Sequence, residues 1–127
     1  MNKISLVVAL LAFQVCISSE NKLFSRCSKL IDEHADLLSK AFNLGEDNLD
    51  KKFKHDVRDE LLFCAIKIEA LAKGLTERAI FLRTMLTQRQ DERVMEGLKA
   101  SVINLERDFE RLGVMYDNFQ KIFNESL

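Results

Sequence analysis

Apolar residues recur at intervals of three and four along most of the chain, the period of an α-helix with one buried face. The first such stretch, residues 20–43, has its apolar line at Phe24, Cys27, Ile31, Ala35, Leu38 and Phe42. The second, about residues 49–73, has its line at Phe53, Val57, Leu61, Cys64, Ile68 and Leu71. Each stretch predicts an amphipathic helix, and Gly45 with the polar residues after it predicts the turn between them.

A basic residue followed by glycine predicts the end of the second helix. Lys73-Gly74 supplies a basic last turn and a glycine, and Thr76 supplies an N-cap for a short third helix. Residues 87–93 contain no apolar side chain, so they predict a turn or sharp kink after that helix. Thr87 and Gln90 fit a capping box there, and Asp91 is a second candidate cap.

The last helix is predicted over residues 92–124 and is the longest. Its apolar line is Val94, Leu98, Val102, Leu105, Phe109, Leu112, Tyr116, Phe119 and Phe123. An alternative is one continuous helix over residues 77–124, roughly 70 Å long. A helix of that length would be left largely unpaired in a monomer and would imply a dimer.

Composition narrows the fold class further. The chain has 127 residues, 47% of them hydrophobic and 31% charged, with no proline and four glycines, which suits a folded helical domain. Strands would normally need turn residues about every 8–12 positions, and the chain lacks them. We therefore expect an all-α, up-and-down bundle of four helices with a short third and a long fourth. The net charge of −1 predicts no general attraction to nucleic acid or to an anionic membrane surface.

The N-terminus predicts export. Lys3 is the only charge before Glu20, and the run from Ile4 to Ile17 is apolar apart from Ser5 and Gln14. This pattern is typical of a secretory signal peptide, and small residues place its cleavage after Ser18, with Ser19 as the alternative. A membrane anchor would need about 20 apolar residues, more than this run has. We expect a signal peptide over residues 1–18, a single secreted domain over 19–127, and no membrane span in the mature chain.

Two cysteines then remain, since Cys16 leaves with the signal peptide. In a secreted chain two cysteines most often form a disulfide. If the first two helices form a hairpin around the predicted turn, Cys27 and Cys64 face each other, because their midpoint in the sequence is 45.5. The sequence thus predicts a Cys27–Cys64 disulfide; the alternative is two free thiols in a reducing compartment.

Residues suited to catalysis or metal binding are sparse. His34 and His55 are the two histidines, and neither has the spacing of a zinc or di-iron ligand set. The acidic residues around His34 are interpreted as a solvated face. No nucleophile–base grouping appears, so we expect no catalytic residues, no metal, no cofactor and no enzyme.

Two surface features are candidate sites. Cations crowd the first turns of the second helix, where the helix dipole disfavours them: Lys51, Lys54, His55 and Arg58. They form either a small anion-binding patch or a solvated face neutralised by the neighbouring acidic residues. Asn124 begins an N-glycosylation sequon close to the C-terminus.

These observations favour a secreted, non-enzymatic interaction or effector protein whose helical bundle binds a protein partner. The alternative is an extracellular carrier of a small apolar ligand held between helices. A third hypothesis is a self-assembling protein that uses an unbroken last helix. A filled core with an exposed apolar patch favours the first, and a closed cavity of a few hundred Å³ favours the second.

Overall fold

The structure is a computed structural model that describes residues 22–48 and 57–126. These residues are almost entirely helical and contain no strand, so the all-α prediction is confirmed. Residues 22–33 are helical, followed by α2 (Ala35–Ala41), α3 (Leu44–Asn48), α4 (Arg58–Leu86) and α5 (Glu92–Glu125). No helix within the described residues is long and apolar enough to cross a membrane.

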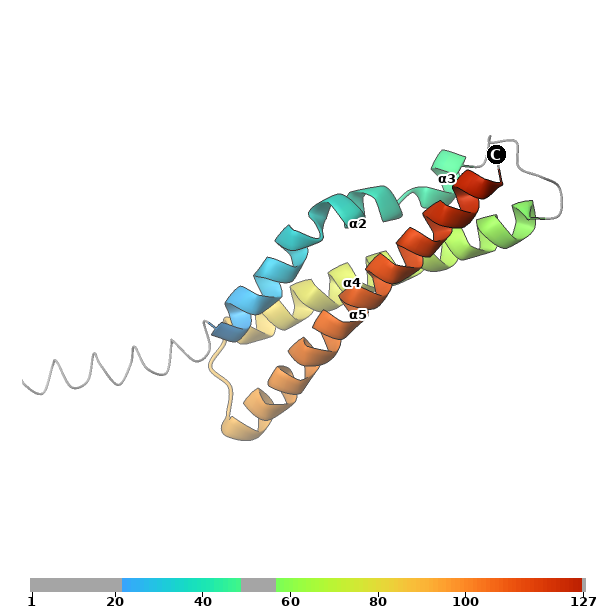
Figure 1. Cartoon of the computed structure of the whole chain (residues 1–127). Helices are drawn as coiled ribbons and strands as arrows, with labels where there is room; N and C mark the ends of the chain where they lie inside the picture. Colours follow the sequence, from blue (N-terminus) through green and yellow to red (C-terminus); the bar gives the residue numbers. More distant parts are fainter. Residues whose placement is uncertain (1–21, 49–56, 127) are drawn as a thin grey trace, which may run out of the picture.

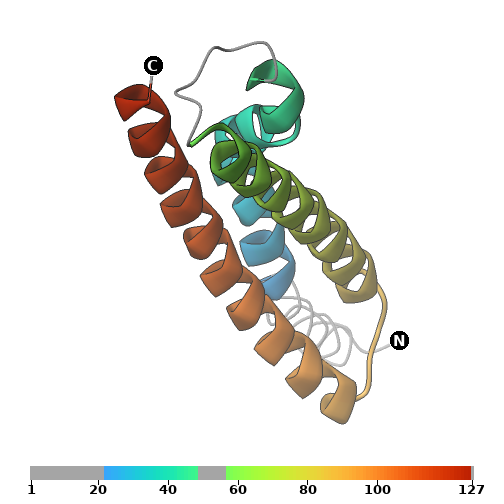
Figure 2. The same ribbon diagram turned by 90° about the vertical axis from the view of Figure 1, so that its right-hand side faces the viewer.

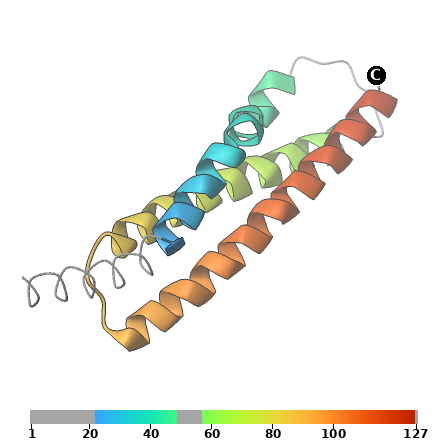
Figure 3. The same ribbon diagram turned by 60° about the vertical axis from the view of Figure 1, so that its left-hand side comes forward.

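The helices form three antiparallel legs. Segment 22–48 is the first leg, α4 returns alongside it, and α5 runs back along both (Figures 1 and 3). Seen from the side, segment 22–48 lies behind the α4–α5 pair and covers one of its faces (Figure 2). The predicted up-and-down order is correct, but three legs replace the four predicted helices.

The first leg bends at His34. Its backbone nitrogen still donates to the Leu30 carbonyl at 3.1 Å, but its φ of −104° and ψ of 11° leave the helical range. The His34 ring adds a second hydrogen bond at the bend. Its Nδ1 lies 2.8 Å from the Leu30 carbonyl oxygen, which can only accept, so Nδ1 carries the proton and donates it. The ring also packs on Phe109 of α5, with centroids 4.8 Å apart. The helix predicted over 20–43 is therefore divided here, and α2 ends at Ala41.

The turn predicted around Gly45 is a helix. Gly45 lies inside α3 and has no positive φ, so it is not a helix C-cap. Its N–H donates to Oε1 of Glu69 in α4, and a Cβ at this position would lie 3.0 Å from that oxygen. Glycine is suited to this site because it lets the start of α3 approach the carboxylate closely. The connection to α4 lies beyond Asn48, in residues 49–56, outside the described part of the chain.

The predicted stop at Lys73-Gly74 is wrong, because α4 continues through it to Leu86. The Thr76 hydroxyl donates back to the Ala72 carbonyl at 2.9 Å, within the helix, and does not cap a new one. The buried face of α4 continues across this point: Leu61, Ala65, Ile68, Ala72, Leu75, Ala79, Leu82 and Leu86. Burial along the whole face outweighs the cost of about 1 kcal/mol for one glycine in a helix.

The predicted turn between α4 and α5 is confirmed. Of the two candidate caps, Asp91 is the one used, since its Oδ1 accepts from the Val94 N–H at 2.8 Å. The Thr87–Gln90 capping box does not form, because Gln90 Nε2 donates to the Met85 carbonyl. The alternative of one continuous helix over 77–124 is therefore excluded.

The long α5 completes the core. It has 34 residues, roughly 51 Å, and its buried line is Leu98, Val102, Leu105, Phe109, Leu112 and Phe119. Two ion pairs tie it to the other legs: Arg26 binds Glu106, and Arg78 of α4 lies 2.7 Å from Asp108. The hydrogen bond to Glu106 raises the pKa of the Arg26 guanidinium further above its usual range.

Candidate functional site

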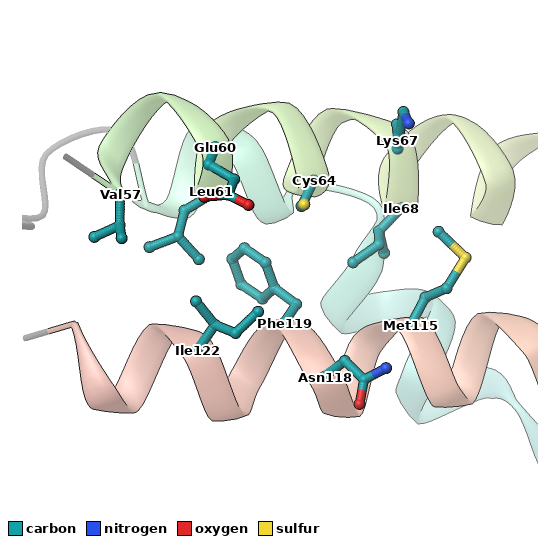
Figure 4. A pocket seen from close by; sticks show the side chains of 10 residues that line it. All are labelled: Val57, Glu60, Leu61, Cys64, Lys67, Ile68, Met115, Asn118, Phe119 and Ile122. Atoms are coloured by element: carbon teal, nitrogen blue, oxygen red, sulfur yellow. The ribbon is translucent and has the colours of Figure 1, made fainter.

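A pocket of about 260 Å³ lies between the start of α4 and the end of α5. It opens on the face of the α4–α5 pair away from segment 22–48, which lies behind the pair (Figure 4). We call this pocket the α4–α5 groove. Its lining residues are Val57, Glu60, Leu61, Cys64, Lys67, Ile68, Met115, Asn118, Phe119 and Ile122.

The walls of the groove follow helical spacing. On the α4 side Val57, Leu61, Cys64 and Ile68 are separated by four, three and four positions. On the α5 side Met115, Phe119 and Ile122 are separated by four and three. These are the intervals at which two packed helices present side chains to a third helix.

Burial divides the groove into a floor and a rim. Leu61, Ile68 and Phe119 are buried and form the floor, and Ile122 is 44% exposed at the rim. Cys64 is half-buried, with its sulfur on the side of α4 that faces α5 (Figure 4). The floor therefore belongs to the folded core, whereas the rim is available to another molecule.

Polar groups are confined to the edge of the groove. Glu60, Lys67 and Asn118 are its polar lining residues, and all three are exposed. Lys67 contributes its stem, because its Nζ lies 4.5 Å from the centre of the Phe63 ring. Beyond the groove, the ion pair between Arg78 and Asp108 bridges α4 and α5. The groove thus offers an apolar surface about three helical turns long, from Val57 to Ile68.

The groove supplies apolar contact and little reactive chemistry. No cluster of three or more metal-ligating side chains occurs in residues 22–48 and 57–126. The Cys64 thiol lies among apolar side chains, and His34 is not a lining residue of the groove. This arrangement suits recognition by shape and by apolar burial.

The structure does not join Cys27 to Cys64, and both are free thiols. Cys27 is fully buried, and its Sγ donates to the carbonyl of Ala79 at 3.1 Å. Ala79 lies fifteen residues beyond Cys64 in α4, roughly 22 Å along the helix, whereas a disulfide requires Cα atoms within about 7 Å.

The reason for this error is the register of the hairpin. Positions 27 and 79 are centred on residue 53, not on 45.5, because the chain continues as α3 where a turn was predicted. Cys27 therefore faces the second half of α4, and Cys64 faces α5.

The two thiols are expected to differ strongly in reactivity. Burial raises the pKa of the Cys27 thiol, and its proton is held by the Ala79 carbonyl, so the reactive thiolate is scarce. Cys64 lines an open groove. Treatment of the native protein with iodoacetamide should modify Cys64 at least tenfold faster than Cys27, with the sites located by peptide mass spectrometry. Equal rates in the native protein would contradict this arrangement; equal rates after unfolding are the control.

The other predicted site residues stay apart from the groove. Lys51, Lys54 and His55 lie outside the described residues, and Arg58 is the exposed first residue of α4, so the anion-binding patch remains untested. Asn124 is exposed on the last turn of α5. Ser126 of its sequon is buried, with Oγ donating to the Ile122 carbonyl at 2.6 Å. The predicted signal peptide, residues 1–18, also lies outside the described chain.

The groove itself was not predicted, and the surplus of apolar residues in the second predicted helix belongs to a different face of α4. In the second half of that predicted helix Leu62, Phe63 and Ile66 lie beside the apolar line, and a helix that is apolar nearly all round is normally covered on more than one side. Segment 22–48 and α5 provide two covers, yet Phe63 and Ile66 stay 58% exposed. The helix therefore has more apolar residues than its two covered faces can bury, and the exposed remainder indicates an interaction surface.

Fold and site together define a class: a small antiparallel helical protein with an apolar groove open to solvent. Comparison with known proteins finds no matching family model, no matching curated protein and no matching solved structure.

Proposed function

We propose that the protein is a secreted, non-enzymatic interaction protein that binds an apolar helical segment of a protein partner in the α4–α5 groove. The observation that carries this proposal is the helical spacing of both groove walls. A third helix laid between them would place its side chains into holes formed by Val57, Leu61 and Cys64 on one wall and by Met115 and Phe119 on the other. Residues 1–18 would direct export and would then be removed, as the N-terminal sequence predicts.

The dimensions of the groove define the chemistry of the partner segment. A span from Val57 to Ile68 accommodates about three helical turns, so the segment would be amphipathic with apolar anchors at positions i, i+3 or i+4, and i+7. The rim carries one carboxylate, Glu60, whereas the Lys67 ammonium group lies over the Phe63 ring, outside the groove. Apolar anchoring, more than net charge, would therefore select the partner.

The outward opening of the groove, beside a core of fully buried side chains, supports partner binding over ligand carriage. Seven large side chains of the core are less than 2% exposed: Phe109, Ile68, Leu75, Leu105, Leu112, Val102 and Cys27. The groove opens outward and lies beside this core. An open apolar strip beside a packed core is typical of a macromolecular docking surface.

The groove is testable by site-specific photo-cross-linking. A benzophenone amino acid is placed at Ile122, on the rim, and separately at Val114, which is 60% exposed on α5 and outside the groove. In extracellular fluid from the source, position 122 should give a cross-linked adduct whose mapped peptide is amphipathic and helical, and position 114 should not. A synthetic copy of that peptide should bind the protein, and Ile122→Glu should weaken binding at least tenfold, whereas Val114→Glu should not. Equal adducts at both positions, or a mapped peptide without apolar helical periodicity, would refute the proposal.

A second function, carriage of a small apolar ligand, is favoured by the same pocket. Its volume of about 260 Å³ is slightly below the usual range for drug-sized ligands, about 300–1,000 Å³, so only a compact molecule would fit. Met115 and Phe119 are adaptable apolar walls for such a molecule. Native mass spectrometry of protein purified from its source distinguishes the two functions: a bound mass that Ile122→Glu removes supports carriage, and ligand-free protein refutes it.

A further inference from the structure

The outer face of α4 carries large apolar side chains that no described residue covers. Phe63, Ile66 and Phe81 are 58%, 58% and 62% exposed, although most residues of their type are buried in proteins. They belong to one line at intervals of three and four: Phe63, Ile66, Ala70, Gly74, Glu77 and Phe81. We call this line the outer α4 face.

This face is separate from the groove. At about 100° per residue, the outer α4 face points away from the buried residues Leu61, Ala72 and Ala79. The groove wall at Cys64 is rotated by about 100° from it along the helix surface. Lys67 lies between the two, with its Nζ over the Phe63 ring.

The outer α4 face is complementary to itself when two copies run antiparallel. If the two copies of residue 72 mark the crossing point, Phe63 lies opposite Phe81, and Ala70 lies opposite Gly74. Lys67 then lies opposite Glu77. Both charged residues are exposed, and Glu77 forms no ion pair within the described part of the chain.

We propose that the outer α4 face is the interface of an antiparallel homodimer, in which α4 of one copy packs on α4 of the other. Because the interface is symmetric, each contact occurs twice, giving two Phe63–Phe81 contacts and two Lys67–Glu77 ion pairs. The charge complementarity between Lys67 and Glu77 selects a second copy over other occupants and sets the register. The apolar contacts supply most of the affinity.

Size and shape fit such a contact. From Phe63 to Phe81 the face includes nineteen residues of the helix, a rise of roughly 27 Å. Its middle is flat, since a Cβ added at Gly74 meets nothing within 4 Å and Ala70 has only a methyl group. Two helices can therefore approach closely at the crossing point, with bulky phenylalanines closing both ends.

Charge reversal with rescue tests the proposal. The dissociation constant of the dimer is measured by analytical ultracentrifugation of the mature protein at low salt. Lys67→Glu alone and Glu77→Lys alone each place like charges opposite each other twice, so each should raise the constant about tenfold. The double variant Lys67→Glu/Glu77→Lys restores opposite charges and should return the constant to within about threefold of the original. Lys99→Glu, an exposed lysine of α5, is the matched control and should change little.

Cross-linking tests the register independently. A mixture of Ala70→Cys and Gly74→Cys chains should form a disulfide between positions 70 and 74 on mild oxidation, identified by peptide mass spectrometry, and faster than either chain alone forms one at its own position. The proposal is overturned if the protein is monomeric to 100 µM, if the double variant dissociates as readily as the single ones, or if the face captures a different protein while the chain remains monomeric. Ile122→Glu should weaken partner binding in the groove and leave the dimer intact. The experiments therefore test the groove proposal and the dimer proposal separately.

Discussion

Replacing Phe109 with alanine is expected to lower the free energy of unfolding by about 3–5 kcal/mol. Phe109 is fully buried in the middle of α5, where it packs on the His34 ring. The substitution removes apolar burial and leaves a cavity at the point where α5 meets the bend of the first leg. A domain of this size is typically stable by about 5–15 kcal/mol, so this loss would be a large fraction of the total. Urea unfolding followed by circular dichroism measures it.

The matched control for this experiment is Phe81→Ala. Phe81 is 62% exposed on the outer α4 face, so the same change should cost about 0.5 kcal/mol or less at a concentration where the protein is monomeric. Similar losses for the two variants would show that Phe109 is not at the centre of the core. A second readout is the His34 ring: its NMR signals should move in Phe109→Ala and stay in Phe81→Ala, because the His34 ring packs on Phe109, whereas Phe81 is exposed on the outer α4 face.

The sequence predicts α5 to within one residue because local signals suffice there. An unbroken apolar line, a run without apolar residues before it, and Asp91 as cap all act within a few turns. The same kind of evidence fails at Gly74, where glycine is a stop signal only if the buried face ends too. In α4 the buried face runs past it to Leu86, and tertiary packing overrides the local preference.

The disulfide error has a different origin. Both thiols lie on the apolar lines predicted for their helices, with Cys27 buried and Cys64 half-buried, but pairing them required the register between two helices. Register depends on where the chain turns, and a short helix, α3, with its Gly45 N–H bound by Glu69, takes the place of the expected turn. Glycine followed by acidic residues occurs both in turns and at the start of a short helix such as α3, so the sequence does not distinguish the two.

The groove could not be predicted for a related reason. Leu61, Cys64 and Ile68 form an apolar line that fits equally well under a covering helix or beside an opening. Only the three-leg arrangement, with segment 22–48 on one face of the α4–α5 pair, leaves the other face open (Figures 2 and 4). The helix α4 thus has three apolar surfaces: one in the core, one along the groove, and the outer α4 face. All three are apolar in the sequence, so the sequence alone does not show which of them is covered.

Replacing Ala79 with leucine is expected to separate the first leg from α4 and to lower the free energy of unfolding by about 1–3 kcal/mol. Ala79 is fully buried, and Cys27 Sγ lies 3.1 Å from its carbonyl oxygen. A leucine side chain has no room there unless residues 22–33 move away from α4. That movement would also strain the neighbouring ion pair between Arg26 and Glu106.

This substitution has a chemical readout in addition to unfolding. As the first leg moves, the hydrogen bond from Cys27 is lost and water reaches the thiol, so alkylation of Cys27 should accelerate at least tenfold while alkylation of Cys64 stays unchanged. Ala100→Leu is the control, since Ala100 is exposed on α5 and the change in helix propensity is the same. It should alter neither stability nor Cys27 reactivity. If Ala79→Leu left Cys27 as protected as before, the close packing of the first leg on the second half of α4, and with it the hairpin register centred on residue 53, would be wrong.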